Sequence, residues 1–447
     1  MILASSWARE RFMEATIDSV PLFFSIVVLA VVTFRSLIPT LRARSVVKTL
    51  FTNREQDSQA VSSTNSTVWI VFPLCRETRM LAQVSAVAWR LCNFHEVIVV
   101  LATSDRCDDT AEKDTTADSI KQLKWPERCR HIHLAAATVG KGALLNAVVS
   151  ELRVPEQDWI GIYDADSEPD PRIVRFVLRQ PAEIDVVQQP SVYAANFRKL
   201  SAEMQIQAAF QTVWSFGVEV PRLSSLSVGN WFRGRPMFRY AVGHGLFLRS
   251  SYLTRSSGRF WEFYEDLGLS IDYVVSPPSL RIAPYWDRCA FAGRSEIWFK
   301  QSANWASGCW LLTYVALQAA RTHHGATRAR LIGLSLAAAW STFLWAVEGL
   351  VLPTTLVASV VFGDAVLSIT FLALLALYVF NGWLIRRLLF EPELGIDTRE
   401  LAAGLDWALG SALLPLVRSV GPFQALVRVF SRSDFTKRAR SYGRTPK

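Results

Sequence analysis

The sequence predicts a mainly parallel α/β domain flanked by membrane-spanning helices on its N-terminal and C-terminal sides. Short apolar runs alternate with helical patterns between residues 65 and 310, and a long apolar stretch lies on each side of this region. The composition agrees, because 51% hydrophobic residues and a mean hydropathy of +0.20 are too apolar for an ordinary soluble protein of 447 residues. The 16 Trp and 26 Phe residues exclude disordered and fibrous proteins.

Residues 1–44 are predicted to contain one transmembrane helix, at about residues 19–38. No charged residue lies between Asp18 and Arg35, and a snorkelling Arg35 extends the apolar stretch to the length of a bilayer crossing. A cleaved signal peptide is the alternative, but the leader contains acidic residues and no small-residue cleavage site follows it. The basic residues after this helix place the next segment in the cytoplasm by the positive-inside rule.

Residues 331–387 are predicted to form a transmembrane hairpin, because the stretch 331–385 is apolar apart from Glu348 and Asp364 and is long enough for two crossings. We expect Pro353 to mark the turn and both acidic residues to lie at the far interface; lining a sugar channel is the alternative. An interfacial segment is expected at 311–330. Residues 388–447 should form amphipathic, interfacial helices and a basic tail, although the stretch 401–430 could also cross the membrane.

A polar linker is expected at 45–64, followed by the α/β domain at 65–310. The predicted strands are apolar runs bounded by turn residues, at 68–74, 96–103, 130–137 and 158–166. Helical patterns at 80–93 and 141–153 separate them. In parallel sheets of this kind, ligands bind beyond the carboxyl ends of the strands, so functional residues are sought there.

Asp164 and Asp166 are the strongest candidates for a chemical role. They follow an apolar strand in the segment YDADSEPD, and residues two apart in a strand point the same way. Two carboxylates with few other ligands hold Mg²⁺ or Mn²⁺ when phosphate oxygens complete the coordination. The alternative is a polar turn rich in Asp and Pro.

Three other strand ends carry polar residues that suit a phosphorylated ligand. Pro73 and Glu77 follow the first strand, and Asp105 follows the second. Lys141 lies between two glycines at a predicted helix start, where free N–H groups favour phosphate. Neither a Walker loop nor a GxGxxG fingerprint is present. Ordinary loop polarity is the alternative for each group.

Taken together and in this order, these motifs resemble those of membrane-embedded family 2 glycosyltransferases, similar to the cellulose, hyaluronan and chitin-oligosaccharide synthases. The set is completed by YEDLGLSID, which resembles the ED motif, and by KQSANW, which resembles QxxRW. The resemblance implies a GT-A catalytic fold, with its Rossmann-like sheet, that transfers a sugar from a UDP- or GDP-sugar with inversion. It also implies a requirement for Mg²⁺ or Mn²⁺.

The resemblance also implies roles on the donor side of the site. Pro73, Glu77, Asp105, Lys141 and Asp164 would contact the nucleotide sugar. Asp164 and Asp166 would bind the metal. Asp266 would be the general base, with Asp272 as a weaker candidate; the alternative is that Glu265 and Asp266 only cap the following helix.

On the acceptor side, the resemblance implies roles for Glu265, Gln301, Trp305 and His244. Asn304 departs from the family pattern, because it stands where processive enzymes keep an Arg that contacts the diphosphate. This departure puts processivity in doubt. A structural role is the alternative for the lone His244.

The favoured function is a polysaccharide synthase-like inverting transferase in the plasma or inner membrane, with its catalytic domain in the cytoplasm. Transfer of a single sugar to a lipid or lipid-linked acceptor is the close alternative. The third possibility is a catalytically inactive domain that binds nucleotide sugar or a partner subunit. A net charge of +9 favours lipid head groups or phosphorylated substrates as partners, and no nucleic acid is expected. A second copy of the chain or an export subunit are further partners left open. The six cysteines contain no CxxC pair, so a zinc site is not expected.

Overall fold

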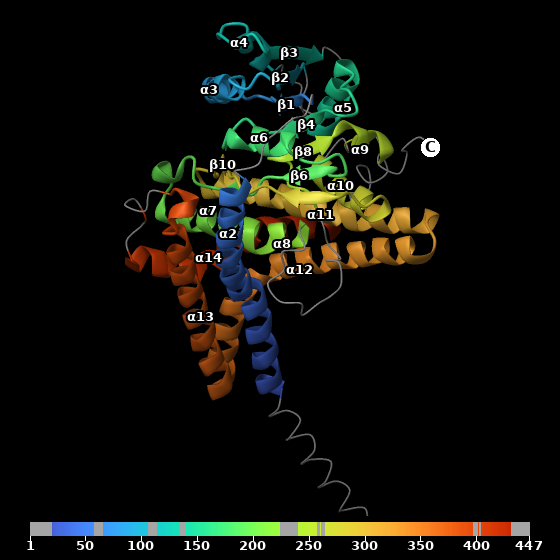
Figure 1. Cartoon of the computed structure of the whole chain (residues 1–447). Helices are drawn as coiled ribbons and strands as arrows, with labels where there is room; N and C mark the ends of the chain where they lie inside the picture. The colour runs from blue at the N-terminus through green and yellow to red at the C-terminus, as the bar shows by residue number, and fades with distance from the viewer. Residues whose placement is uncertain are drawn as a thin grey trace, which may run out of the picture.

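The computed structural model describes residues 20–57, 66–105, 114–134, 140–223, 240–256, 260, 264–396, 401 and 404–430. Figure 1 shows three levels along one axis. A sheet with its helices lies at the top, helices α7, α11 and α14 run across the middle, and α13 extends downward beside the N-terminal helix. The basic tail predicted at the C-terminus falls outside the described residues.

The main sheet has seven strands in the order β3-β2-β1-β4-β8-β6-β9. Strands β3, β2, β1 and β4 are mutually parallel, β8 is antiparallel to both of its neighbours, and β6 and β9 are parallel. A second sheet has the order β5-β10-β7. The bounds are β1 Val68–Pro73, β2 Val97–Ser104, β3 Cys129–Leu134, β4 Trp159–Ile162, β5 Ser167–Pro169, β6 Val186–Gln188, β7 Ser191–Val192, β8 Leu246–Arg249, β9 Leu280–Ile282 and β10 Asp287–Cys289.

Both faces of the main sheet are buried, which explains its nearly continuous apolar strands. In β1, Trp69 and Val71 belong to a core that includes side chains of α5 and α7. The alternate residues Val68, Ile70 and Phe72 belong to the opposite core, beneath α3 and α6. The helices of the domain are α3 Leu81–Leu91, α4 Thr116–Ile120, α5 Lys141–Leu152, α6 Arg172–Leu178, α7 Ala202–Trp214, α8 Val220–Leu223, α9 Ser250–Arg255 and α10 Glu265–Val275.

The mainly parallel α/β sheet is therefore confirmed, and the predicted strands correspond to β1, β2, β3 and β4. The predicted linker at 45–64 differs from the structure. Helix α2 covers Ile38–Asp57, so it continues the N-terminal helix through much of that segment. Its side chains explain the continuation: Val46, Val47 and Leu50 are buried in the same core as β1. Tertiary packing thus stabilises a helix in a segment that its polarity alone marked as a linker.

Three helices in the described part of the chain are long and apolar enough to cross a membrane: Val20–Arg54, Gly325–Phe362 and Ala365–Leu389. Large apolar side chains point outward from them; Phe23, Val360 and Ile369, for example, are 71%, 73% and 67% exposed. A lipid environment would cover such surfaces. Each of these candidate helices overlaps one of the stretches predicted to cross a membrane.

The C-terminal helices differ from the predicted segments at their ends. The expected interfacial segment at 311–330 is divided between α11 Ser295–Thr322 and the first residues of α12 Gly325–Phe362. The hairpin turns at Gly363, not at Pro353, which lies inside α12. Gly363 adopts φ 62°, and Asp364 then caps α13 Ala365–Leu389 by accepting a hydrogen bond from the Leu367 N–H at 3.0 Å.

Helix α12 is continuous from Gly325 to Phe362, and α14 Gly404–Phe430 packs against it. The Ser419 hydroxyl donates to the Trp345 carbonyl at 2.7 Å and accepts from the Gly349 N–H at 2.9 Å. It is therefore inserted between a carbonyl and an N–H that would pair in a regular α-helix. Figure 1 shows the early part of α12 running across the molecule and the later part running down beside α13.

The π-helical segment η4 Ser215–Glu219 packs against α2, which directly follows a second π-helical segment, η1 Thr33–Leu37. Each is followed two residues later by a proline, Pro39 or Pro221, which lacks the N–H that a regular helix would use. The contact is close, because a Cβ on Gly217 would lie 2.1 Å from the Pro39 carbonyl oxygen. Glycine at 217 is therefore what allows the N-terminal helix to approach the α/β domain so closely.

We expect Gly217→Ala to destabilise the protein by roughly 1–3 kcal/mol, because the added methyl group meets backbone that cannot move aside. Thermal unfolding of the detergent-purified protein measures this as a lower Tm. Gly293→Ala is the matched control, since no atom lies within 4 Å of its added Cβ. Equal Tm values for the two variants would contradict this account of the contact.

Candidate active site

A cavity of about 490 Å³ extends from the sheet into the helices below it. Asp164, Asp166, Lys141 and Asp266 line its upper end. Arg35, Ser341, Trp345 and Arg418, which belong to the candidate membrane helices and to α14, line the opposite end. One continuous space therefore joins the carboxylates predicted for donor binding to the candidate membrane helices.

Asp164 and Asp166 lie in the turn between β4 and β5, not at the end of a strand. The Ser167 N–H donates to the Asp164 carbonyl at 3.1 Å, which closes the turn. Alternation along a strand therefore does not explain why both side chains face the cavity; the turn between the two sheets does. The two carboxylates are brought together as predicted, by a different backbone geometry.

Lys141 connects the two acidic motifs. Its Nζ lies 2.6 Å from Asp164 Oδ1 and 2.8 Å from Glu265 Oε1, and it donates to the Gly243 carbonyl at 2.7 Å. Lys141 is the first residue of α5, after Gly140 at φ 96°. The left-handed conformation of Gly140 lets the chain turn into the helix with Lys141 facing the cavity.

Glu265 and Asp266 begin helix α10, and Asp266 Oδ1 accepts a hydrogen bond from the adjacent Leu267 N–H at 2.8 Å. They border the cavity beside Gly243, whose added Cβ would lie 2.8 Å from Glu265 Oε1 and 3.4 Å from Asp266 Oδ2. A side chain at 243 would therefore displace the carboxylates. Burial and the nearby Glu265 raise the pKa of Asp266 to about 7.

At the end of the cavity lined by Asp164 and Asp166, the negative charge of the carboxylates exceeds the positive charge of the nearby cations. Burial and the Asp164 charge raise the pKa of Asp166 to about 6, and burial, Asp166 and Asp164 raise the pKa of Glu77 to about 7. Burial also favours protonated Asp164, but the Lys141 ammonium outweighs it and lowers that pKa. A divalent cation on Asp164 and Asp166 would neutralise this excess, so the residues present fit Mg²⁺ or Mn²⁺.

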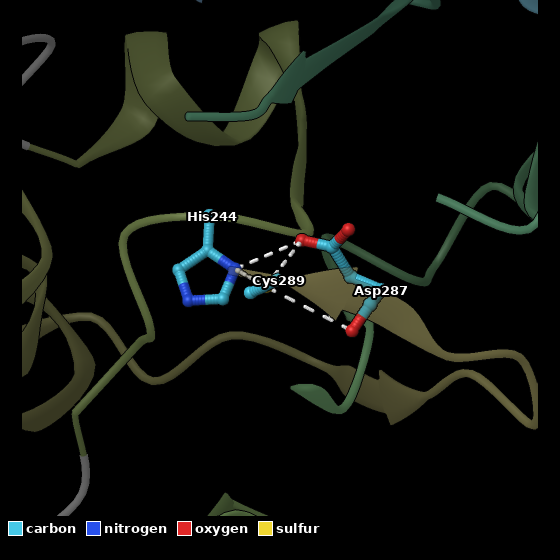
Figure 2. A group of neighbouring side chains, drawn as sticks. All are labelled: His244, Asp287 and Cys289. Atoms are coloured by element: carbon cyan, nitrogen blue, oxygen red, sulfur yellow. Dashed lines mark hydrogen bonds and ion pairs between the residues drawn. The ribbon is translucent and has the colours of Figure 1, made fainter. Parts of the chain in front are cut away.

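His244 is held by a buried partner that the sequence did not reveal. Its Nδ1 lies 2.9 Å from Asp287 Oδ2, and Cys289 Sγ lies 3.4 Å from each of these atoms. Burial lowers the pKa of His244, but Asp287 more than compensates and raises it to about 9. Figure 2 shows the second ring nitrogen, Nε2, on the side away from Asp287 and Cys289.

His244, Asp287 and Cys289 also have the composition of a metal site, since one ligand atom from each lies within 4.8 Å of the others. In this structure, however, His244 Nδ1 and Asp287 Oδ2 are paired with each other. Asp287 therefore acts on the cavity by orienting His244, and the metal expectation stays with Asp164 and Asp166. The segment WDRC contains two of the three residues, but their partner lies more than 40 residues earlier in the chain.

The predicted acceptor residues Gln301 and Trp305, and Asn304 between them, lie on α11 and line the cavity. Asn304 Oδ1 accepts a hydrogen bond from the Tyr264 hydroxyl at 2.8 Å. Trp305 packs edge-on against Trp298 at a centroid distance of 5.6 Å. Asn304 thus fixes a tyrosine beside Glu265 and Asp266.

The remaining predicted donor residues lie outside the cavity lining. Pro73 is the last residue of β1. Glu77 is close enough to Asp164 and Asp166 for their negative charges to raise its pKa. Asp105 lies 3.4 Å from His133 Nε2, at the end of β2. The structure therefore places Glu77 near the carboxylates and Asp105 farther along the sheet edge, where its predicted nucleoside contact stays a prediction.

Several cavity residues were not predicted: Trp214, Glu219, Tyr240, Trp345 and Arg418. Glu219 is buried in the π-helical η4 and accepts a hydrogen bond from the Tyr240 hydroxyl at 3.1 Å. The only indication in the sequence that Glu219 has a special role was its position as an acidic residue in an apolar stretch. Nothing in the sequence indicated that it would face the donor motifs.

No protein-family model matches the chain, and no curated protein sequence matches it. Among solved structures, it is similar to glucosyl-3-phosphoglycerate synthase from Mycobacterium tuberculosis in complex with Mn²⁺, UDP and phosphoglyceric acid, at 17% identity, with a TM-score of 0.32 and coverage of 55% of this chain and 79% of that chain. The same enzyme with Mn²⁺, UDP-glucose and phosphoglyceric acid gives 17% identity, a TM-score of 0.31 and coverage of 55% and 80%.

Proposed function

We propose that this chain is a metal-dependent inverting glycosyltransferase that uses a UDP- or GDP-sugar at the cytoplasmic face of a membrane. The observation that carries the proposal is the single cavity shared by Asp164, Asp166, Asp266 and the membrane helices. Its upper end suits a diphosphate with a divalent cation, and its lower end opens a space where a membrane-derived acceptor would lie.

In this proposal, Asp266 removes the proton from an acceptor hydroxyl. The hydroxyl oxygen forms a bond to the anomeric carbon of the donor while the bond from that carbon to the diphosphate breaks, and the nucleoside diphosphate leaves. Lys141 holds Asp164 and Glu265 in place, and His244 offers Nε2 to the cavity as a hydrogen-bond donor.

Asp164 and Asp166 would hold Mg²⁺ or Mn²⁺, which would neutralise the charge of the leaving diphosphate when bound. Glu77 would lie near the charge of the diphosphate, at one end of the nucleotide site. Pro73 and Asp105 keep their proposed roles beside the nucleoside, at the carboxyl ends of β1 and β2.

Addition of a single sugar is the form of the activity that packing favours over glycan extension. Below the cavity, Gly349 brings α12 and α14 into backbone contact, because its added Cβ would lie 2.8 Å from the Pro415 carbonyl oxygen. Glu348 fills the adjacent space with 3% of its surface exposed. This close packing leaves little room for a polymer to pass between the two helices.

A panel of UDP- and GDP-sugars, incubated with the purified full-length protein and Mn²⁺ or Mg²⁺, tests the function. Nucleotide release and product size are recorded with and without lipid extract. We expect release from one donor with a single-sugar adduct, whereas a ladder of products would establish glycan extension. Release from no donor under any condition would overturn the proposed activity.

The pH dependence of transfer tests the base. Because Asp266 must be deprotonated to accept a proton, and its pKa is raised to about 7, activity should rise with pH through about 7 and be lost below it. Glu265→Gln removes a neighbouring charge that raises this pKa, so the rising limb of kcat should move to lower pH. An unchanged limb in this variant would assign the titration to another group.

A further inference from the structure

We propose that Arg35 and Arg418 form an anion-binding site at the membrane end of the cavity, and that this site holds a phosphate or carboxylate group of the acceptor. The ligand assignment rests on the proposed function, whereas the anion site itself rests on the geometry described below. Both arginines line the same cavity as Asp266.

The first observation is an excess of buried positive charge. Arg35 Nε lies 3.1 Å and Arg418 Nη2 lies 3.2 Å from the same Glu348 oxygen, Oε2. The three side chains are only 12%, 6% and 3% exposed. Two guanidinium groups therefore share one carboxylate, which leaves one positive charge with little access to water. An uncompensated charge in such a place is costly unless a further anion accompanies it.

The second observation is that donors of this cluster remain unused. Arg35 Nη2 is buried and has no hydrogen-bond partner among the described residues. The indole Nε1 of Trp345, on the same part of the cavity wall, is likewise buried and unpaired within the described structure. Buried N–H groups normally have acceptors, so two unused donors beside a surplus positive charge indicate a missing oxygen anion.

The third observation is that the cluster is held rigidly. The Arg418 guanidinium stacks on Phe210 at 4.0 Å from the ring centroid, and the Ser36 hydroxyl donates to Glu348 Oε1 at 3.3 Å. The close contact of α12 with α14 at Gly349 supports it from below. A site fixed in this way loses little conformational entropy when a ligand binds.

Among the residues that the structure describes, Glu348 is the only carboxylate that forms an ion pair with Arg35 or Arg418. Glu219, another carboxyl group that lines the cavity, accepts a hydrogen bond from the Tyr240 hydroxyl at 3.1 Å. Burial raises the pKa of Glu219, which disfavours its charged form. The cavity is therefore acidic at its donor end, where a metal is expected, and cationic at its membrane end. An acceptor with its hydroxyl at Asp266 would place an anionic group between the two arginines.

The test uses matched pairs of soluble probes with the full-length protein in nanodiscs of phosphatidylcholine, and with empty nanodiscs as the blank. Hexyl phosphate is compared with hexanol, and hexyl glucuronide with hexyl glucoside, by isothermal titration calorimetry without donor. We expect at least one anionic probe to bind ten- to one-hundredfold more tightly than its neutral counterpart, the range for a charge-assisted hydrogen bond. Preference for the phosphate would indicate a lipid phosphate acceptor, and preference for the glucuronide a sugar acid.

Arg35→Gln and Arg418→Gln should each remove this preference, since either leaves Glu348 paired with one arginine and no surplus charge. Arg44→Gln is the control, because Arg44 pairs with Glu391 at 2.7 Å on the surface, with 48% of its side chain exposed. Equal binding of charged and neutral probes to the unmodified protein would overturn the anion site, even if a variant failed to fold. Binding is measured without transfer, so Asp266→Asn should keep the preference, and a failed transfer assay would overturn only the proposed function.

Discussion

Asp266→Asn is expected to lower the rate of sugar transfer by about 10²- to 10⁴-fold, the range for loss of a general base. The amide cannot accept the proton of the acceptor hydroxyl, but it keeps the size of the carboxyl group and can still accept the Leu267 N–H bond. Nucleotide binding should therefore persist and the protein should remain folded. Transfer rate, nucleotide affinity and Tm of the same preparation provide the measurement.

Asp272→Asn is the matched control for this prediction. Asp272 lies on the same helix α10, was the weaker candidate for the base, and does not line the cavity of the described structure. We expect its transfer rate to stay close to that of the unmodified protein. If Asp272→Asn loses activity and Asp266→Asn keeps it, the base assignment is wrong.

Asp166→Ala is expected to weaken metal-dependent donor binding by more than about 100-fold. Even residues that only support a metal ligand typically contribute 10- to 100-fold to affinity, and Asp166 is one of the two proposed carboxylate ligands. Titration of the accepted nucleotide sugar, with Mn²⁺ or with a chelator, measures the effect. In the variant, Mn²⁺ should no longer improve donor binding.

Glu168→Ala provides the comparison, because Glu168 is a partly exposed carboxylate two residues farther along, on β5, outside the cavity lining. Its donor affinity should keep the full dependence on Mn²⁺. Retained metal dependence in Asp166→Ala would remove this residue from the metal site. Together with Asp266→Asn, these variants separate donor binding from the chemical step.

The α/β sheet and the candidate membrane helices could be predicted because both depend on patterns local in the chain. Apolar strands such as Val68–Pro73 are buried on both faces of the sheet. Nearly every residue of such a strand is therefore apolar, and this run can be recognised in the sequence. The length of an apolar stretch similarly records a bilayer crossing. Element ends were less predictable, since the hairpin turn depends on the left-handed Gly363 and the cap at Asp364, which compete with the more conspicuous Pro353.

The sequence by itself determined which chemical groups are available: the carboxylates Asp164, Asp166 and Asp266, and the ammonium group of Lys141. Only the tertiary structure decided what surrounds these groups. It set Asp287 against His244, which is 43 positions distant in the chain, and Glu348 against Arg35 and Arg418, which are 313 and 70 positions distant. Such pairs leave no periodic pattern, because the energy of a buried charge depends on partners brought together by folding and not on neighbours in the chain.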